Sequence, residues 1–182
     1  MRLVLIDRDG VLNTDRPDSV KSPGEFALLP RAGEAVARLN EAGIKVAVVT
    51  NQSVVGRGII GEDMLERIHQ KMHDELAKAG ARIDALLVAP DAPGNHSERR
   101  KPAPGMLREA LSRFDAVANE SPMIGDALRD LEAAAALGCP RILVRTGKGA
   151  ATQAAGLPDA VLPVTVREDL WDAVVHIQDG NP

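Results

Sequence analysis

Two carboxylates lie one residue apart near the start of the chain, in the stretch MRLVLIDRDGVLN. Asp7 and Asp9 follow a run of aliphatic residues, a pattern typical of a buried strand that ends in a turn. Asp and Gly commonly end strands as turn formers, which is one interpretation of the pair. Carboxylates this close also resist ionising together, and a cation held between them is the other interpretation.

Further polar residues follow later apolar runs. Thr50 begins the stretch TNQS after a second run, Arg100 and Lys101 lie in RRKPAPG before a helical pattern, and GDALRD places Asp126 and Asp130 after a fourth run. In an open α/β sheet, ligands bind at the carboxyl ends of the strands. We therefore expect acids, a hydroxyl and a lysine to meet at one rim of a sheet.

This set of residue types suits phosphoryl transfer, in which a protein positions groups and neutralises charge on the transferring oxygens. Carboxylate oxygens of Asp7 and Asp126 would hold a hard divalent ion, Mg²⁺. Asp7 could attack phosphorus to form an aspartyl-phosphate. Asp9 would protonate the leaving alkoxide and then take a proton from the attacking water. Thr50 and Lys101 would bind phosphoryl oxygens.

The elements that must position these residues alternate along the chain. Short apolar runs predict buried parallel strands over 2–6, 45–49, 84–88, 122–124, 141–145 and 160–164. Amphipathic spacing predicts helices over 31–42, 62–79, 104–114, 128–137 and 167–177. This alternation predicts an α/β fold, a Rossmann-like three-layer α/β/α sandwich with a mostly parallel sheet. We expect one domain over 1–182, with long and therefore functional loops at 13–30 and 90–103.

Composition excludes several classes of partner. Of 182 residues, 45% are hydrophobic and 26% charged, which is globular, and the net charge of −4 disfavours nucleic acid as a partner. No run is long and apolar enough to span a membrane, so we expect no membrane partner. The single Cys139 cannot form an internal disulfide, and no signal peptide is evident near Met1. We expect a cytoplasmic protein.

The order of these motifs resembles the haloacid dehalogenase (HAD) superfamily of aspartate-nucleophile phosphatases. DRDG comes first, then Thr at a strand end, then Lys before a helix, then GD followed by a second Asp. The stretches DRDGVLN, VVTNQSVVGRG, RRKPAPGM and ILVRTGKG most resemble the D,D-heptose 1,7-bisphosphate phosphatase family, and less closely the histidinol-phosphate phosphatases. That family is capless, so the resemblance implies that short loops shape the substrate pocket.

The resemblance also implies roles for individual residues. Asp7 matches the nucleophile, and Asp9 matches the acid-base residue that also lends its main-chain carbonyl to the metal. Asp126 matches a metal ligand, and Thr50 and Lys101 match the groups that stabilise the phosphoryl oxygens. The predicted substrate contacts are Asn51, Gln52, Ser53, Arg57 and Arg100. For Arg57, between glycines, a solvated surface arginine is the alternative.

The chain departs from the family at its zinc site. Many relatives hold a structural zinc with a Cys-x-His pair and a Cys-x-Cys pair around the loop before the Arg-Lys motif. In this sequence Ala89, Asp91, Ser97 and Arg99 stand at those four places, and a lone His96 cannot close a tetrahedral site. We therefore predict no zinc, and we expect Arg99 to add a second cation beside Arg100.

Three smaller features have open or structural interpretations. Relatives often carry Lys where this chain has Ala127, which affects some substrate contacts. His69 and His73 lie one helical turn apart, and we interpret them as surface histidines because the motif of a zinc protease is absent. TGKG around Lys148 lacks the pattern of a phosphate-binding P-loop and is expected to be a turn near the pocket.

Two alternatives remain at the level of function. A phospho-signalling receiver module also uses Asp, Mg²⁺, Thr and Lys, but its acceptor follows the third strand, whereas Asp7 follows the first. Histidinol phosphate or a nucleic-acid phosphate end are alternative substrates. Because Arg57, Arg99 and Arg100 exceed the needs of a monophosphate, we predict a sugar bisphosphate. The resemblance to the heptose enzymes implies D-glycero-D-manno-heptose 1,7-bisphosphate, which would lose its phosphate at carbon 7. We expect a monomer.

Overall fold

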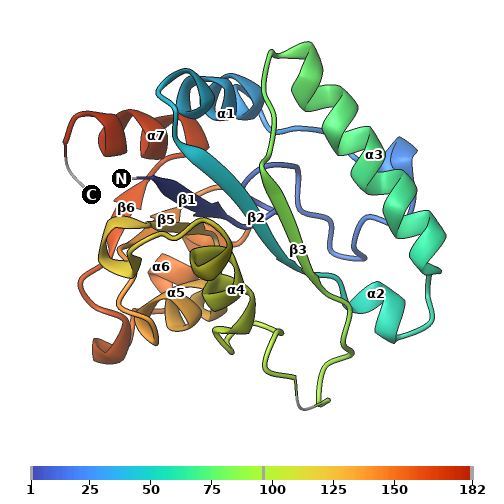
Figure 1. Ribbon diagram of the computed structural model, residues 1–182. Helices are drawn as coiled ribbons and strands as arrows, with labels where there is room; N and C mark the ends of the chain where they lie inside the picture. The colour runs from blue at the N-terminus through green and yellow to red at the C-terminus, as the bar shows by residue number, and fades with distance from the viewer. Residues whose placement is uncertain (1, 96, 181–182) are drawn as a thin grey trace.

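Six parallel strands form the central sheet of the computed structural model, which describes residues 2–95 and 97–180 (Figure 1). The strands are β1 (Leu3–Ile6), β2 (Lys45–Asn51), β3 (Ala85–Ala89), β4 (Met123–Gly125), β5 (Arg141–Val144) and β6 (Thr165–Arg167). Their order across the sheet is β3-β2-β1-β4-β5-β6, and every neighbouring pair is parallel. The predicted mostly parallel α/β sheet is confirmed.

β1 lies in the middle of the sheet and is apolar on both of its faces. Its residues pair with β2 on one side, from Leu3 with Lys45 to Ile6 with Val48, and with β4 on the other. Val4 and Ile6 join one hydrophobic core, whereas Leu3 and Leu5 join the core on the opposite face. A strand covered on both faces needs a continuous apolar run, which is what the sequence LVLI provides.

Helices cover both faces of this sheet. The longer helices are α1 (Ala32–Glu41), α3 (Glu62–Lys78), α4 (Gly105–Arg113), α5 (Leu128–Ala135) and α7 (Leu170–Gln178); the shorter ones are α2 (Ser53–Gly56) and α6 (Gly149–Ala154). α1, α3 and α7 contribute to the core on one face, and α4 and α5 contribute to the core on the other (Figure 1). The result is the predicted three-layer α/β/α sandwich. None of the described helices is long and apolar enough to cross a bilayer.

The predicted strand over 160–164 is wrong. Asp159–Val161 form a single 3-10 turn, and the edge strand begins later, at Thr165. Pro163 interrupts the apolar run and has no amide hydrogen for a sheet ladder, so the strand starts after it. β6 pairs with β5 from Thr165 to Arg167 and has little apolar character of its own. The short helices α2 and α6 were not predicted either.

Two long connections pass over the carboxyl end of the sheet. The connection after β1 returns through isolated bridges, in which Asn13 pairs with Asp9 and with Leu28. Its one helical turn is the short 3-10 segment Pro23–Glu25. The described residues between β3 and α4 contain no helix or strand. Loops rather than an inserted domain therefore border the strand ends in the described part of the chain.

Candidate active site

The candidate site lies where the strand order reverses. The chain passes from β1 to β2 on one side of the sheet, and later returns to β4 on the other side of β1. Asp7 directly follows β1, and Asp126 directly follows β4. In an open parallel sheet, this reversal leaves a crevice at the carboxyl ends, which is where ligands bind. The topology thus brings together two acids that are 119 positions apart in the sequence.

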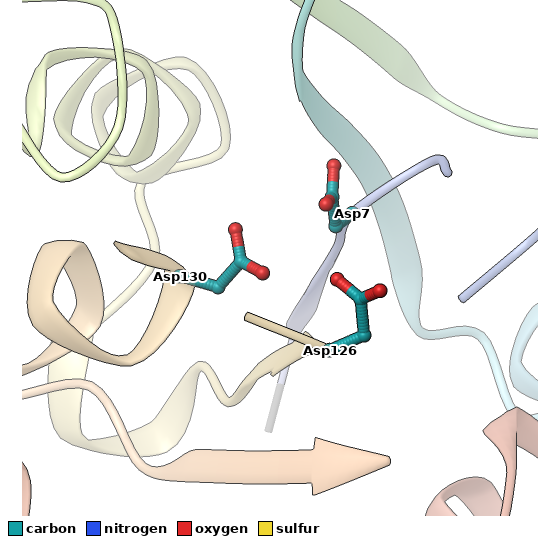
Figure 2. Close-up of side chains that lie close together, drawn as sticks. All are labelled: Asp7, Asp126 and Asp130. Carbon is teal, nitrogen blue, oxygen red and sulfur yellow. The ribbon is translucent and has the colours of Figure 1, made fainter. Parts of the chain in front are cut away.

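Three buried carboxylates gather at this point. One oxygen from each of Asp7, Asp126 and Asp130 lies within 4.8 Å of the others. Figure 2 shows Asp7 and Asp126 with their carboxylates directed toward the same space, and Asp130 beside them. All three are almost fully buried. A buried cluster of like charges is costly unless cations neutralise it.

The pKa values of Asp7 and Asp126 show this cost. Burial raises the pKa of Asp7 to about 6, although Lys101 opposes the effect. Burial and the neighbouring Asp7 raise the pKa of Asp126 to about 7. Oδ2 of Asp126 accepts a hydrogen bond from the Lys148 amide at 2.8 Å, whereas its buried Oδ1 has no hydrogen-bond partner among the described residues. Free carboxylate oxygens and excess negative charge fit a divalent cation such as Mg²⁺.

Two glycines allow the main chain to approach Asp126 closely. A Cβ atom at Gly10 would lie 2.1 Å from Asp126 Oδ2, and one at Gly147 would lie 2.2 Å from the same oxygen. Both glycines have positive φ, so a side chain at either place would also strain the backbone. Thr146 connects the loop that carries Gly147 to the loop that carries Gly10, because its hydroxyl donates to the Gly10 carbonyl at 2.7 Å. The turn TGKG, predicted only to lie near the pocket, thus forms part of the wall around Asp126.

Lys101 lies at the centre of the cluster and is fully buried. Its Nζ is 3.0 Å from Asp7 Oδ1 and 2.6 Å from Asp130 Oδ1, and it donates to the Val49 carbonyl at 2.8 Å. Burial alone would lower the pKa of this ammonium, but Asp130 and Asp7 outweigh burial and raise it. Lys101 therefore stays charged and partly neutralises Asp7.

Asp130 has two partners within the protein. Its Oδ1 faces Lys101, and its Oδ2 accepts the amide of Ala127 at 3.1 Å, at the start of α5. With both oxygens engaged, this carboxylate orients the lysine and caps the helix. Of the three acids, Asp7 and Asp126 are the pair left to face a cation.

The main chain of Lys101 is held by Asn51. The Asn51 side chain donates to the Lys101 carbonyl at 2.9 Å and accepts from the Lys101 amide at 3.0 Å. Because Asn51 ends β2, this pair of hydrogen bonds ties the loop before α4 to the sheet. We predicted Asn51 as a substrate contact; it borders the cavity, and its amide is used within the protein.

Asp9 receives a dense set of hydrogen bonds. The Arg8 guanidinium contacts both of its oxygens at 3.0 Å, Asn13 donates to Oδ1 at 2.9 Å, and Gln52 donates to Oδ2 at 2.7 Å. Burial alone would raise the pKa of Asp9, but Arg8 and these donors more than compensate and hold it below its usual value. Asp9 is thus ionised, and its carboxylate is fixed at the start of the loop that follows β1.

His69 supports this arrangement from α3. Its Nε2 lies 3.2 Å from Arg8 Nη1, and both side chains are buried. Burial and the Arg8 charge lower the pKa of His69 to about 4, so the ring is neutral near pH 7. The predicted surface position is therefore wrong for His69, which packs onto the loop after β1. His73 is exposed, as predicted.

The other residues of the TNQS stretch lie at different depths. The buried Thr50 hydroxyl accepts a hydrogen bond from Gln52 Nε2 at 2.9 Å. Gln52 is itself buried, and its amide nitrogen donates to both Thr50 and Asp9; its substrate contact stays a prediction. Ser53 reaches the cavity. Arg57 is exposed at the end of α2, outside the residues that line the cavity, and its substrate contact stays a prediction.

A small cavity of about 140 Å³ opens beside these residues. It is lined by Asp9, Asp15, Arg16, Pro17, Ser19, Asn51, Ser53, Arg100, Arg129 and Lys148. A wider hollow of about 720 Å³ lies on α1 and α7 around Trp171, at the opposite end of β2. The wider hollow lies away from the carboxyl ends of the strands, so the smaller, polar cavity is the candidate substrate pocket.

Arg100 and Arg129 border this cavity on two different elements. Arg100 precedes α4 and donates to the Asp91 carbonyl at 3.0 Å. Burial and the charge of Arg129 lower the pKa of Arg100, which shows that the two guanidinium groups repel each other. Arg129 was not singled out from the sequence, where a lone arginine on a helix carries no distinctive signal.

The residues at the four positions of the family's zinc ligands make other contacts. Ala89 is buried at the end of β3 and offers no ligand atom. The Ser97 hydroxyl donates to Asp91 Oδ2 at 2.8 Å, and Arg99 forms an ion pair with Glu109 on α4. His96 lies outside the described residues. The absence of zinc stays a prediction, and Arg99 faces Glu109 rather than serving as a second free cation beside Arg100.

Comparisons with known proteins agree with one family. A HAD-hydrolase-like family model matches residues 98–173. D-glycero-beta-D-manno-heptose-1,7-bisphosphate 7-phosphatase of Bordetella bronchiseptica is 44% identical over 171 residues, covering 93% of this chain and 94% of that protein. The protein of the same name from Pseudomonas aeruginosa is 39% identical over 160 residues, covering 88% and 90%.

Solved structures give the same result. The crystal structure of D,D-heptose 1,7-bisphosphate phosphatase from B. bronchiseptica, complexed with magnesium and phosphate, has a TM-score of 0.93 and 42% identity, with 99% of each chain covered. The phosphatase of the same name from Burkholderia thailandensis has a TM-score of 0.75 and 39% identity, with 98% of this chain and 99% of that chain covered. The chain described here therefore belongs to the D,D-heptose 1,7-bisphosphate phosphatase family of HAD phosphatases.

Proposed function

We propose that this protein is a Mg²⁺-dependent phosphatase that removes the C7 phosphate of D-glycero-β-D-manno-heptose 1,7-bisphosphate and leaves the 1-phosphate. The observation that carries the proposal is the buried pair Asp7 and Asp126, with Lys101 3.0 Å from Asp7, close to a cavity bordered by cations. The β anomer is the one named for the Bordetella, Neisseria and Pseudomonas relatives.

Asp7 is the group placed to attack phosphorus. It ends the central strand, and Lys101 at 3.0 Å favours its ionised, nucleophilic form against the effect of burial. Attack forms a bond between an Asp7 oxygen and phosphorus and breaks the bond from phosphorus to the C7 oxygen. Asp7, Asp126 and the main-chain carbonyl of Asp9 would hold Mg²⁺, which would supply positive charge to offset the carboxylates and the phosphate.

Asp9 is the group placed to move the proton. The leaving C7 oxygen takes a proton from Asp9, and in the second step Asp9 takes one from the water that hydrolyses the aspartyl-phosphate. Arg8 keeps Asp9 ionised in the free protein. The negative charge of an arriving phosphate raises the pKa of a neighbouring carboxyl, so substrate binding itself favours the protonated form.

Thr50 and Lys101 are placed to stabilise the phosphoryl oxygens. The Thr50 hydroxyl accepts from Gln52 and so directs its own hydrogen away from Gln52. The ammonium of Lys101 faces three oxygens of the protein, which take its three N–H bonds, so it would act on the phosphoryl oxygens through its fixed positive charge. Groups fixed in this way need no reorganisation as charge develops on the transferring group.

The proposal is tested by a panel of phosphate esters assayed with Mg²⁺. We expect the heptose 1,7-bisphosphate to have a higher kcat/KM than histidinol phosphate or an aryl phosphate. Phosphorus NMR of the product should show the anomeric phosphate retained and the primary phosphate released. Release of the anomeric phosphate, or a higher kcat/KM for histidinol phosphate, would overturn the substrate assignment and leave the aspartate mechanism standing.

We also propose that residues 1–182 form one domain that acts as a monomer in the cytoplasm. One sheet and its adjoining loops supply every residue of the candidate site, so no second subunit is needed to complete it. Light scattering coupled to size exclusion should give the mass of one chain. A stable dimer that loses activity on dilution would contradict this part of the proposal.

A further inference from the structure

A histidine lies on the apolar face of α3. Among the buried residues of this helix, His69 is the polar one beside Leu65, Ile68, Met72 and Leu76. The helix packs through this face, so an aliphatic side chain would serve the packing as well as a histidine does. Nε2 of His69 lies 3.2 Å from Nη1 of Arg8, which is itself fully buried. The contact with Arg8, rather than the burial of apolar surface, therefore explains a histidine at this position.

The ring of His69 acts as a neutral acceptor. A guanidinium can only donate, so Nε2 must accept the hydrogen bond from Arg8 and the ring hydrogen lies on Nδ1. The lowered pKa of His69 keeps the ring uncharged near pH 7. A carboxylate at this position would compete with Asp9 for the charge of Arg8, and an aliphatic side chain would leave Nη1 without this acceptor. A neutral acceptor satisfies Nη1 and leaves the charge of Arg8 to Asp9.

The other edge of the Arg8 guanidinium contacts Asp9. Nη2 lies 3.0 Å from each carboxylate oxygen, and Nε lies 3.3 Å from Oδ1. Because a guanidinium is planar and rigid, an acceptor that holds Nη1 also fixes the direction of Nη2 and Nε. Arg8 is fully buried, whereas the side chain of Asp9 is 23% exposed and lines the cavity. The contacts thus connect α3, through Arg8, to the carboxylate at the cavity.

We propose that His69 is a positioning residue of the phosphatase reaction, which orients the Asp9 carboxylate toward the leaving oxygen through Arg8. This inference rests on the proposed function, in which Asp9 gives a proton to that oxygen. His69 itself contacts neither the substrate nor the metal in this account. General acid-base help is typically worth ~10²–10⁴-fold, and a misplaced catalytic group can lose ~10²-fold. We therefore expect His69 to account for about a ten- to hundredfold effect.

The test separates proton transfer from the rest of the reaction by means of the leaving group. A sugar alkoxide needs a proton in order to leave, whereas para-nitrophenolate leaves as the anion. His69→Leu removes the acceptor and should lower kcat/KM for the heptose 1,7-bisphosphate about ten- to a hundredfold. The same variant should lower kcat/KM for para-nitrophenyl phosphate by less than about threefold. An equal loss with both substrates would show a merely structural role and would overturn the proposal, as would an unchanged kcat/KM for the bisphosphate.

Two further variants of α3 serve as rescue and control. His69→Gln keeps a neutral acceptor for Nη1 and should recover most of the activity that His69→Leu loses. His73→Leu makes the same change one helical turn later, at an exposed position, and should match the wild type with both substrates. A His69→Gln variant as poor as His69→Leu would contradict the role of the acceptor.

A double-mutant cycle shows whether His69 acts through Arg8. Arg8→Met should show the same dependence on the leaving group, and adding His69→Leu to it should change kcat/KM for the bisphosphate by less than about twofold. The double variant leaves no buried donor without a partner, so it keeps the test decisive even if His69→Leu alone does not fold. Losses that multiply would overturn the proposal. Asp9→Asn is the reference: if it lowers kcat/KM equally for both substrates, the proton transfer in the proposed function is refuted instead.

Discussion

Replacing Asp126 by Asn should stabilise the metal-free protein while removing its response to Mg²⁺. Asn keeps the shape of the side chain and an oxygen that can accept the Lys148 amide, now at 2.8 Å. The packing of Gly10 and Gly147 against this position is therefore retained. What disappears is one of two adjacent buried negative charges.

The magnitude follows from the raised pKa of Asp126. A change from the ordinary value of 3.8 to about 7 corresponds to about 4 kcal/mol at about 1.36 kcal/mol per pKa unit. The folded protein holds this proton more tightly than the unfolded chain does. The associated stability is therefore present below pH 3.8, is lost as the pH rises, and is fully lost above pH 7. Relaxation of the loops around the site reduces the effect, so we expect Asp126→Asn to gain about 2–4 kcal/mol at pH 8.

Urea unfolding in a metal chelator measures this gain directly. The difference between variant and wild type should be largest at pH 8 and should shrink to about 1 kcal/mol at pH 4.5, where most of the wild-type penalty is absent. Saturating Mg²⁺ should then raise the stability of the wild type and leave the variant nearly unchanged. A variant no more stable than the wild type at pH 8, or a gain independent of pH, would refute the account of the acid pair.

Three further outcomes are expected. Asp7→Asn should fold normally and reduce turnover to background, because the nucleophile is lost; more than a few percent of wild-type phosphate release would contradict the covalent mechanism. Arg100→Ala should lower kcat/KM about ten- to a hundredfold for the bisphosphate and little for a small aryl phosphate, and a similar loss with both would remove Arg100 from substrate recognition. Elemental analysis of the purified protein should find no zinc that resists a chelator; a stoichiometric zinc whose removal lowers the melting temperature would show that other ligands hold it.

Strand ends explain why much of the site could be predicted. Asp7, Thr50 and Asp126 each stand where an apolar run stops, and a parallel sheet brings its carboxyl ends to one edge whatever the loops between them do. The order of the motifs, with the acid pair after the first strand, then favours a phosphatase over a phospho-signalling receiver module. These properties depend on local pattern and topology, and both can be deduced from a single sequence.

Residues whose place depends on tertiary packing could not be predicted in this way. His69 has the spacing of a surface histidine, and only the packing of α3 against the loop after β1 buries it beside Arg8. The hydrogen bonds by which the buried Gln52 joins Asp9 and Thr50 also depend on packing and were not predicted. The missed strand at Thr165 has the same cause, because an edge strand of mixed composition is defined by its partner β5 rather than by its own residues.

Two hydrogen bonds from Asn51 hold the main chain of Lys101. They make the position of Lys101 independent of the loop between β3 and Lys101. Lys101 takes its position from β2, whereas the loop is fastened separately through Ser97 and Asp91. In such a chain, a loop held by thiolates and zinc can be replaced by a loop held by a hydrogen bond between a hydroxyl and a carboxylate. The ammonium next to Asp7 does not have to move. Because the same loop carries Arg100, substrate preference can diverge during evolution while the machinery of phosphoryl transfer is inherited unchanged.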